Sequence, residues 1–356
     1  MDHRFVQWIG IIGLKCMFKP EGICLPLPLS KSDGMYSLLE GIDNIRLNFS
    51  EGSLLFMNIT LAAIMFGVAL EIRIQNFKDI LKYPKSAMLG VGSQFIILPA
   101  LTFILVIILN PPPSVAMGMI LIASCPGGNI SNFISSLSKA NVALSVSLTA
   151  VATLSATLMT PLNFALWGGM YVRYSTRAMH LNIPIEIDFL QMAQTVFILL
   201  GVPLLLGMYV GNRFPQFTKK YLKLIKIGSI LLYLVFIFGA LYANLEHFAG
   251  SILPIGILVL LLNVVTLSSG FLVGTISRVS RADRRTLSIE TGIQNSGLAL
   301  ILIFNPKLFD GNGGMAFMAA WWGIWQMISG LVLAAILSRI KIPVLREARV
   351  PVDSSK

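Results

Sequence analysis

The sequence predicts an all-α polytopic membrane protein with about nine transmembrane helices. Three observations lead to this prediction: a low content of charged residues, a series of long apolar stretches, and basic residues gathered in alternate connections. Of the 356 residues, 55% are hydrophobic and 12% are charged. Because soluble domains carry roughly 25% charged residues, this chain lacks the polar surface that a soluble fold of its size requires.

Nine apolar windows are long enough to cross a bilayer, which takes about 20 residues in a helix. Each window is expected to be helical, because hydrocarbon offers no hydrogen-bond partner to an open strand edge. The windows lie at residues 52–71, 84–109, 114–138, 141–171, 189–212, 221–245, 250–277, 285–305 and 314–338.

Lysine and arginine in the connections predict the orientation. Nineteen of them lie on one side, at positions within 73–85, 139, 213–226, 278–285 and 339–356. The opposite connections carry only Arg173, Arg177 and Lys307. Since basic loops stay in the cytoplasm, we expect a cell (inner or plasma) membrane protein with its N-terminus outside and its C-terminus cytoplasmic. This bias accounts for the net charge of +11 without a nucleic-acid partner.

Two windows are interrupted by polar and helix-breaking residues near their middle. In the third, Pro126-Gly127-Gly128 removes a backbone donor and favours non-helical angles, and polar residues then open a second half-helix. In the eighth, a polar run from Glu290 to Gly297 suggests a break at Gly292–Gly297. Broken helices at mid-membrane expose carbonyls to cations and half-helix N-termini to anions, which is typical of transporter sites.

The order of the spans predicts an inverted repeat of five plus five helices with the first helix missing. The first set then holds four spans and the second set five, and in both sets one further span follows the interrupted one. The two discontinuous helices occupy corresponding positions of the two halves, where secondary transporters place their binding sites.

Glu290 is the one acidic residue inside an apolar window away from its edges. A charge at mid-helix costs roughly 2.5–3.5 kcal/mol on insertion scales, so a compensating partner is needed. A bound cation is one solution. The alternative is that Glu290 lies near the cytoplasmic surface, five residues after Arg285, and pairs with an arginine.

Other polar residues in the windows suit a cation site as well. Gln94 interrupts the second window, and Ser145 and Thr149 share one face of the fourth by their spacing. Their oxygens, together with a carboxylate, are hard ligands that suit a small cation such as sodium. Four amides are assigned instead to helix–helix packing, with lining of the cavity as the alternative: Asn58, Asn163, Asn263 and Gln326. Trp321, Trp322 and Trp325 are expected in an aromatic belt at the outer interface.

These motifs resemble the bile acid:sodium symporter family. The resemblance rests on SCPGGNISN (124–132), NVALSVSLT (141–149), SQF (93–95) and RRTLSIETGIQNSG (284–297), and it extends from about residue 52 to 338. It implies two crossed, broken helices in a core domain and a smaller panel domain that moves against the core.

The resemblance also implies two sodium sites and an anion site. The first sodium site would use Ser131, Asn132, Ser145, Thr149 and Glu290. The second would use Glu290, Gln294 and Gln94, with backbone oxygens of Thr291 and Ile293. The organic anion would lie by Asn129 and Asn295, at the two half-helix N-termini. No cofactor is implied beyond Na⁺ as the coupling ion.

The expected domain organisation follows. Residues 1–50 form an extracytoplasmic N-terminal extension, of which residues 1–34 are variable or precede a translation start at Met35. Residues 51–340 form the transporter domain, and residues 341–356 a cytoplasmic tail. The panel comprises windows 52–71, 189–212 and 221–245, and the core comprises 84–171 and 250–338.

The leading functional hypothesis is a sodium-coupled symporter that imports an organic anion, bile-acid-like or a smaller carboxylate, by alternating access. A proton-coupled or uncoupled carrier is a close alternative, and a non-transporting membrane sensor is the alternative from another class. An enzyme is not expected, because the windows hold no histidine and no aspartate for a catalytic pair. The expected partners are the anion, Na⁺ and membrane lipid; the particular anion and the oligomeric state stay open.

Overall fold

The computed structural model describes residues 16–17, 25–26, 39, 41–45, 51–73, 75, 78, 82–128, 130–178, 188–243 and 252–339. The expected cytoplasmic tail at 341–356 and most of the N-terminal extension lie outside these ranges. The strands β1 (Cys16–Met17) and β2 (Leu25–Pro26) have two residues each, and every other regular element described is helical. The all-α prediction is therefore confirmed.

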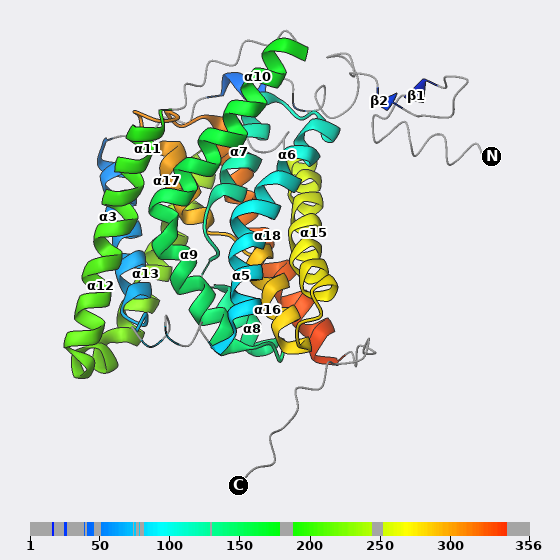
Figure 1. Cartoon of the computed structure of the whole chain (residues 1–356). Coiled ribbons are helices and arrows are strands. Elements are labelled where there is room, and N and C mark those ends of the chain that lie inside the picture. Colours follow the sequence, from blue (N-terminus) through cyan, green and yellow to red (C-terminus); the bar gives the residue numbers. More distant parts are fainter. Residues whose placement is uncertain are drawn as a thin grey trace.

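The helices stand side by side as a bundle (Figure 1). In chain order they are α3 (Glu51–Ala69), α5 (Pro84–Gly92), α6 (Leu98–Leu109), α7 (Pro113–Ser124), α8 (Ile130–Leu137), α9 (Val142–Asn163), α10 (Gly169–Ala178), α11 (Phe189–Val196), α12 (Val202–Arg213), α13 (Pro215–Ala243), α15 (Ile252–Ile276), α16 (Arg281–Gly292), α17 (Ser296–Phe304) and α18 (Gly313–Arg339).

Among the residues that the structure describes, five continuous helical stretches are long and apolar enough to cross a membrane. They are Pro84–Leu109, Val142–Arg177, Phe189–Arg213, Ile252–Ile276 and Gly313–Ser338. A repeatedly spanning helical membrane protein is thereby supported, while the count of nine spans and the inverted repeat stay predictions.

Three of these stretches contain one widened, π-helical segment each: η3 (Ser93–Ile97), η4 (Phe164–Gly168) and η5 (Phe197–Gly201). Pro99 and Pro203 each follow such a segment by two residues. Because proline has no backbone N–H, it frees a carbonyl of the preceding turn, and the helix can widen there. The first of these segments carries Gln94, one of the predicted ligands.

The third and eighth windows are each divided into two short helices. The third consists of α7 and α8, and the eighth of α16 and α17. The second break is narrower than the predicted Gly292–Gly297: α16 ends at Gly292 and α17 begins at Ser296. The Asn295 side chain accepts a hydrogen bond from the Leu298 N–H, and this cap starts α17 early enough to include Gly297.

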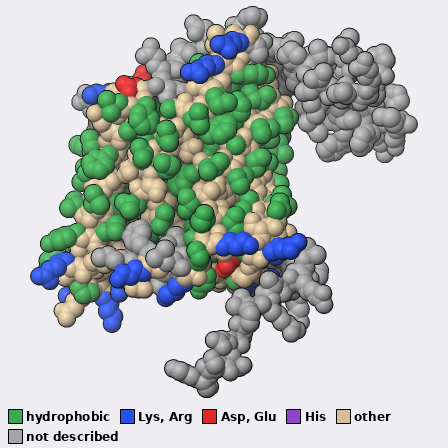
Figure 2. Space-filling model, viewed as in Figure 1, with side chains coloured by type: hydrophobic (Ala, Val, Ile, Leu, Met, Phe, Trp, Pro, Cys, Tyr) green, Lys and Arg blue, Asp and Glu red, His purple; other side chains and the backbone are tan. Residues whose placement is uncertain are grey.

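Apolar side chains cover the visible side of the bundle between its two ends, and lysine and arginine lie at those ends (Figure 2). Exposed apolar residues such as Leu158, Leu205 and Val264 occur along the helices, as a lipid-facing surface requires.

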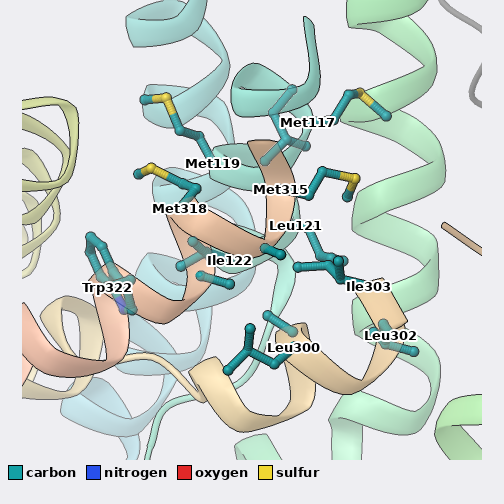
Figure 3. Close-up of a cluster of buried hydrophobic side chains, with 14 of the residues drawn as sticks. Met117, Met119, Leu121, Ile122, Leu300, Leu302, Ile303, Met315, Met318 and Trp322 are labelled. Atoms are coloured by element: carbon teal, nitrogen blue, oxygen red, sulfur yellow. The ribbon is translucent and has the colours of Figure 1, made fainter. Parts of the chain in front are cut away.

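The interior holds an apolar core where α7, α17 and α18 meet (Figure 3). Met119, Ile122, Met318 and Trp322 are among its members, and Trp322 is 0% exposed. Trp322 therefore packs inside the protein, and its assignment to a lipid-facing aromatic belt is wrong. Trp322 belongs to the same buried cluster as Met119 and Ile122 of α7 instead of to the outer interface.

A short segment of the N-terminal region also belongs to the bundle. Leu39 and Ile42 are buried in the same core, and residues 42–44 form a single turn, η1. Asp43 Oδ1 accepts a hydrogen bond from the Ser114 N–H at 2.8 Å, and the Ile45 carbonyl accepts one from the Gly313 N–H at 2.9 Å. The segment 39–45 thus satisfies free N–H groups at the starts of α7 and α18.

Candidate functional site

The two breaks meet inside the protein. Gly127 and Gln294 form an isolated antiparallel bridge. The Gly128 N–H donates to the Ile293 carbonyl at 2.9 Å, and the Asn295 N–H donates to the Pro126 carbonyl at 2.8 Å. Unwound segments have backbone groups without intrahelical partners, and each segment here supplies partners to the other. The two interrupted helices therefore cross at these points.

Glycine lets the two segments approach closely where they cross. A Cβ on Gly127 would lie 2.6 Å from Gln94 Nε2 and 3.3 Å from Glu290 Oε2. A Cβ on Gly128 would lie 3.0 Å from the Gln294 carbonyl oxygen. The first contact is shorter than real side chains tolerate, so a larger residue at 127 would displace one of the predicted ligands.

Two amides from neighbouring helices hold the second break. On α18, Gln326 Oε1 accepts from the Gln294 N–H at 2.9 Å, and Gln326 Nε2 approaches Ser296 Oγ at 3.5 Å. On α15, Asn263 Nδ2 donates to the Gly292 carbonyl at 3.1 Å. Both amides were predicted to lie in helix–helix packing, and both do form hydrogen bonds between helices. Nothing in the sequence indicated that their partners are backbone groups of the break.

Hydroxyl groups from α8 and α9 surround the carboxylate of Glu290. Ser131 Oγ donates to Glu290 Oε1 at 2.6 Å, and Ser145 Oγ donates to the same oxygen. Thr149 Oγ1 lies 3.1 Å from Glu290 Oε2. All of these side chains are buried, with Glu290 only 2% exposed. One carboxylate on α16 thus joins α8 and α9, at sequence separations of 159, 145 and 141 residues.

Asn132 completes this group. Its Oδ1 lies 2.8 Å from Ser145 Oγ and 3.2 Å from Thr149 Oγ1, so each hydroxyl hydrogen has both Asn132 and Glu290 within reach. The structure therefore brings together the five side chains named for the first sodium site: Ser131, Asn132, Ser145, Thr149 and Glu290. The Ser145 and Thr149 oxygens face the same partner because the two residues are one helical turn apart.

Two buried amides lie on the other side of the crossing. Gln94 and Gln294 are 2% and 1% exposed. Within the described part of the chain, Gln94 Nε2 and Gln294 Oε1 have no hydrogen-bond partner. Gln294 Nε2 donates to the Thr291 carbonyl at 2.8 Å. Buried polar atoms are normally satisfied, so the amide ends without a partner suit a ligand at this place.

The backbone oxygens named for the second sodium site carry hydrogen bonds already. The Thr291 carbonyl accepts from Gln294, and the Ile293 carbonyl accepts from Gly128. A carbonyl oxygen has two lone pairs, so one remains on each for a cation. A contact that the sequence did not indicate also lies here: the hydroxyls of Ser93 and Thr291 are 3.0 Å apart.

Of the two residues named for the anion, Asn295 precedes the first residue of α17 and is partly exposed, unlike its buried neighbours. Its Oδ1 accepts from the Leu298 N–H at 3.1 Å, which leaves its amide nitrogen free of that contact. Asn129 lies outside the described residues.

The nearest arginine in sequence, five residues before Glu290, has a different partner. Arg285 Nη1 donates to the Ser138 carbonyl at 2.8 Å, at the C-terminal end of α8, where a cation is favoured by the helix dipole. The contacts of Glu290 are with hydroxyl groups. The geometry therefore favours the cation interpretation of Glu290 over its pairing with an arginine.

The chain is similar to known sodium-dependent transporters. The model of the Sodium Bile acid symporter family matches residues 58–251. The chain is 30% identical to the uncharacterized sodium-dependent transporter YocS of Bacillus subtilis, and the match covers 80% of this chain and 83% of that protein. It is 30% identical to the probable sodium/metabolite cotransporter BASS1, chloroplastic, of Arabidopsis thaliana, over 94% of this chain and 77% of the relative.

A further relative is the ileal sodium/bile acid cotransporter of Homo sapiens, with 32% identity over 70% of each chain. The family suggested by the sequence motifs is confirmed by these matches. Sodium-dependent transport and repeated membrane crossing are properties of that family. The long apolar helices of this chain fit the repeated membrane crossing. The chain belongs to the sodium bile acid symporter family.

Proposed function

We propose that this protein is a sodium-coupled symporter that imports an organic anion across the cell membrane by alternating access. The observation that carries the proposal is the Glu290 carboxylate, which lies where the broken helices cross and is surrounded by oxygen atoms of α8 and α9. A negative charge is costly for a carboxylate buried among hydroxyl groups, and a bound cation would offset that cost.

The first sodium ion is proposed to bind among the oxygens of Ser131, Asn132, Ser145, Thr149 and Glu290. The support is that these oxygens already converge through hydrogen bonds to one another. A sodium ion would replace these hydrogen bonds by oxygen–ion contacts, with the hydroxyl hydrogens turned outward. Hydroxyl, amide and carboxylate oxygens are hard ligands and favour Na⁺ over softer metals.

The second sodium ion is proposed to bind between Gln94, Gln294 and the other side of Glu290, with the carbonyls of Thr291 and Ile293. The support is the pair of buried amide ends that lack a partner, together with the closeness of Gln94 and Glu290 around Gly127. The amide orientation of Gln94 is interchangeable by rotation, and the oxygen faces the ion in the sodium-bound state.

The organic anion is proposed to bind beside Asn295 and Asn129, at the starts of α17 and α8. The positive dipole end of a half-helix favours a carboxylate or sulfonate there. The anion would range from bile-acid-like compounds to smaller carboxylates.

Coupling between sodium and anion binding follows because both proposed sites adjoin the crossing of the two broken helices. Gln294 adjoins Asn295, and the Asn295 N–H is bonded to Pro126 on the opposite break. Sodium ions that order the crossing therefore also order the anion site, and each ligand raises the affinity for the other by the same factor. The panel of α3, α11–α12 and α13 is proposed to move against the remaining helices, which form the core.

Uptake into proteoliposomes tests this proposal. Purified protein should accumulate radiolabelled taurocholate or a small keto acid when sodium is present outside, and lose this uptake when choline replaces sodium at constant pH. A proton-coupled or uncoupled carrier would continue to work in choline. A sensor without transport would bind the anion in a sodium-dependent way but accumulate nothing, and that result would reject the symporter.

A further inference from the structure

A second buried carboxylate lies on the helix that carries Glu290. Asp283 is in the first turn of α16 and is 7% exposed. It precedes Glu290 by seven residues, or about two helical turns, so both side chains lie on the same side of α16. The predicted sodium ligands do not include Asp283.

Both oxygens of Asp283 accept hydrogen bonds from other helices. Ser86 Oγ, on α5, donates to Oδ2 at 2.8 Å. Asn141 Nδ2, at the start of α9, donates to Oδ1 at 2.8 Å. The Asp283 N–H donates to Ser280 Oγ at 3.1 Å, which caps α16. A Ser-x-x-Asp pattern at a helix start normally directs the acid back to the cap. Here the acid joins α5 and α9 to α16 instead.

Each helix held by Asp283 supplies oxygen atoms to the proposed sodium sites. Asn141 is four residues, one turn, before Ser145, and Ser86 is eight residues before Gln94. The Asn141 carbonyl also accepts from Thr286 Oγ1 at 3.0 Å. Contacts between α9 and α16 thus run from Asn141 and Asp283 at one end to Ser145 and Glu290 further in, on matching faces of both helices.

We infer that Asp283 is a positioning residue that sets the register of α5 and α9 against α16, and so places the oxygens of both proposed sodium sites around Glu290. This inference rests on the proposed function. The carboxylate is suited to the task because it accepts from two donors at once and because a negative charge is stabilised in the first turn of a helix. Asp283 does not touch the ion itself.

The pair Asn141–Asp283 permits a charge-exchange test. Asn141→Asp places a second carboxylate against Asp283, so the two repel, while the new side chain still caps α9 through the Leu144 N–H, which Asn141 Oδ1 accepts at 3.1 Å. Adding Asp283→Asn restores an amide–carboxylate pair with exchanged roles, and the amide oxygen that this second substitution introduces can still accept from Ser86. Asn141→Ser is the matched control, because it keeps the cap and removes only the amide donor.

The measurement is binding of radioactive sodium to the purified protein in detergent. Asn141→Asp should raise the half-saturating sodium concentration roughly tenfold, and the double variant should return within about threefold of the unchanged protein, as coupled neighbours do. The half-saturating sodium concentration of Asn141→Ser should lie between those of the other two variants. The inference is overturned if Asn141→Asp binds sodium as Asn141→Ser does, or if Asp283→Asn fails to rescue it. If Asn141→Asp alone does not fold, recovery of folded, sodium-binding protein in the double variant is the expected result.

The failure of this inference is distinguishable from that of the proposed function. If the unchanged protein binds no sodium, the proposed function fails. The contact between Asn141 and Asp283 is then tested by thermal unfolding of the same variants in choline chloride. The same pattern is expected there: a lower melting temperature for Asn141→Asp and recovery in the double variant. Equal melting temperatures for Asn141→Asp and the double variant would overturn the positioning role.

Discussion

The hydroxyl of Ser131 donates to the carboxylate of Glu290 at 2.6 Å, although 159 residues separate them in the chain. Ser131 lies just after the first break and Glu290 just before the second. Their contact holds α8, the second half of one broken span, against α16, the first half of the other. Predictions about ion binding therefore concentrate on the residues around this contact.

Glu290→Gln should abolish sodium binding and sodium-dependent uptake. The amide keeps the size of the side chain and its ability to accept from Ser131, but it removes the charge that a cation neutralises. Radioactive sodium binding measures the effect, and Asp188→Asn is a matched control, because Asp188 is an exposed cap of α11. Sodium binding by Glu290→Gln at the level of the control would contradict the assignment.

Gly127→Ala should weaken sodium binding strongly while the protein stays folded. The added Cβ would lie 2.6 Å from Gln94 Nε2, and the end of that flexible side chain has to move away. Gly169→Ala is the matched control, since a Cβ at that helical position meets nothing within 4 Å. Sodium titrations followed by thermal shift compare the two variants, and an identical sodium response in both would exclude Gln94 from the site.

Gln326→Leu should lower the free energy of unfolding by about 1–3 kcal/mol, because it leaves the buried Gln294 N–H without an acceptor. Gln326→Glu should be milder, since burial favours the neutral carboxylic acid there and its carbonyl oxygen can still accept from that N–H. Unfolding of the purified proteins in denaturant measures both. If the two variants lose equal stability, the contact with Gln294 is not what Gln326 contributes.

Asn295→Asp should separate anion transport from sodium binding. An aspartate keeps the cap on the Leu298 N–H, so α17 and the melting temperature should be preserved. The new negative charge at the half-helix N-terminus should repel the organic anion and reduce its uptake by at least about tenfold. Uptake that continues at the original rate would place the anion elsewhere.

A chain that starts at Met35 should retain its stability, whereas one that starts after Ile45 should lose it. Leu39 and Ile42 are buried in the core, and Asp43 and Ile45 satisfy N–H groups at the starts of α7 and α18. Thermal unfolding of the two shortened proteins measures the difference. Equal melting temperatures would show that the segment 39–45 contributes nothing to the bundle.

Much of the site was accessible from the sequence for a physical reason. A carboxylate, glycines and short polar side chains are costly in an apolar helix, so Glu290 and the Pro126-Gly127-Gly128 run stood out against their surroundings. The Ser145 and Thr149 spacing predicted a shared helix face, and the structure turns that face toward Glu290. The sequence pattern was sufficient to locate these residues, because each polar residue differs from the apolar residues around it.

The sequence by itself determined that this protein is a helical membrane protein with two broken spans, because hydrophobic length and helix breakers act locally. Only the tertiary structure decided which groups meet. Asp283 gains its partners only where α5 and α9 pack against α16, and the burial of Trp322 overturns its assignment to the aromatic belt. Hydrogen bonds between helices depend on their relative rotation and register, which no short stretch of sequence contains.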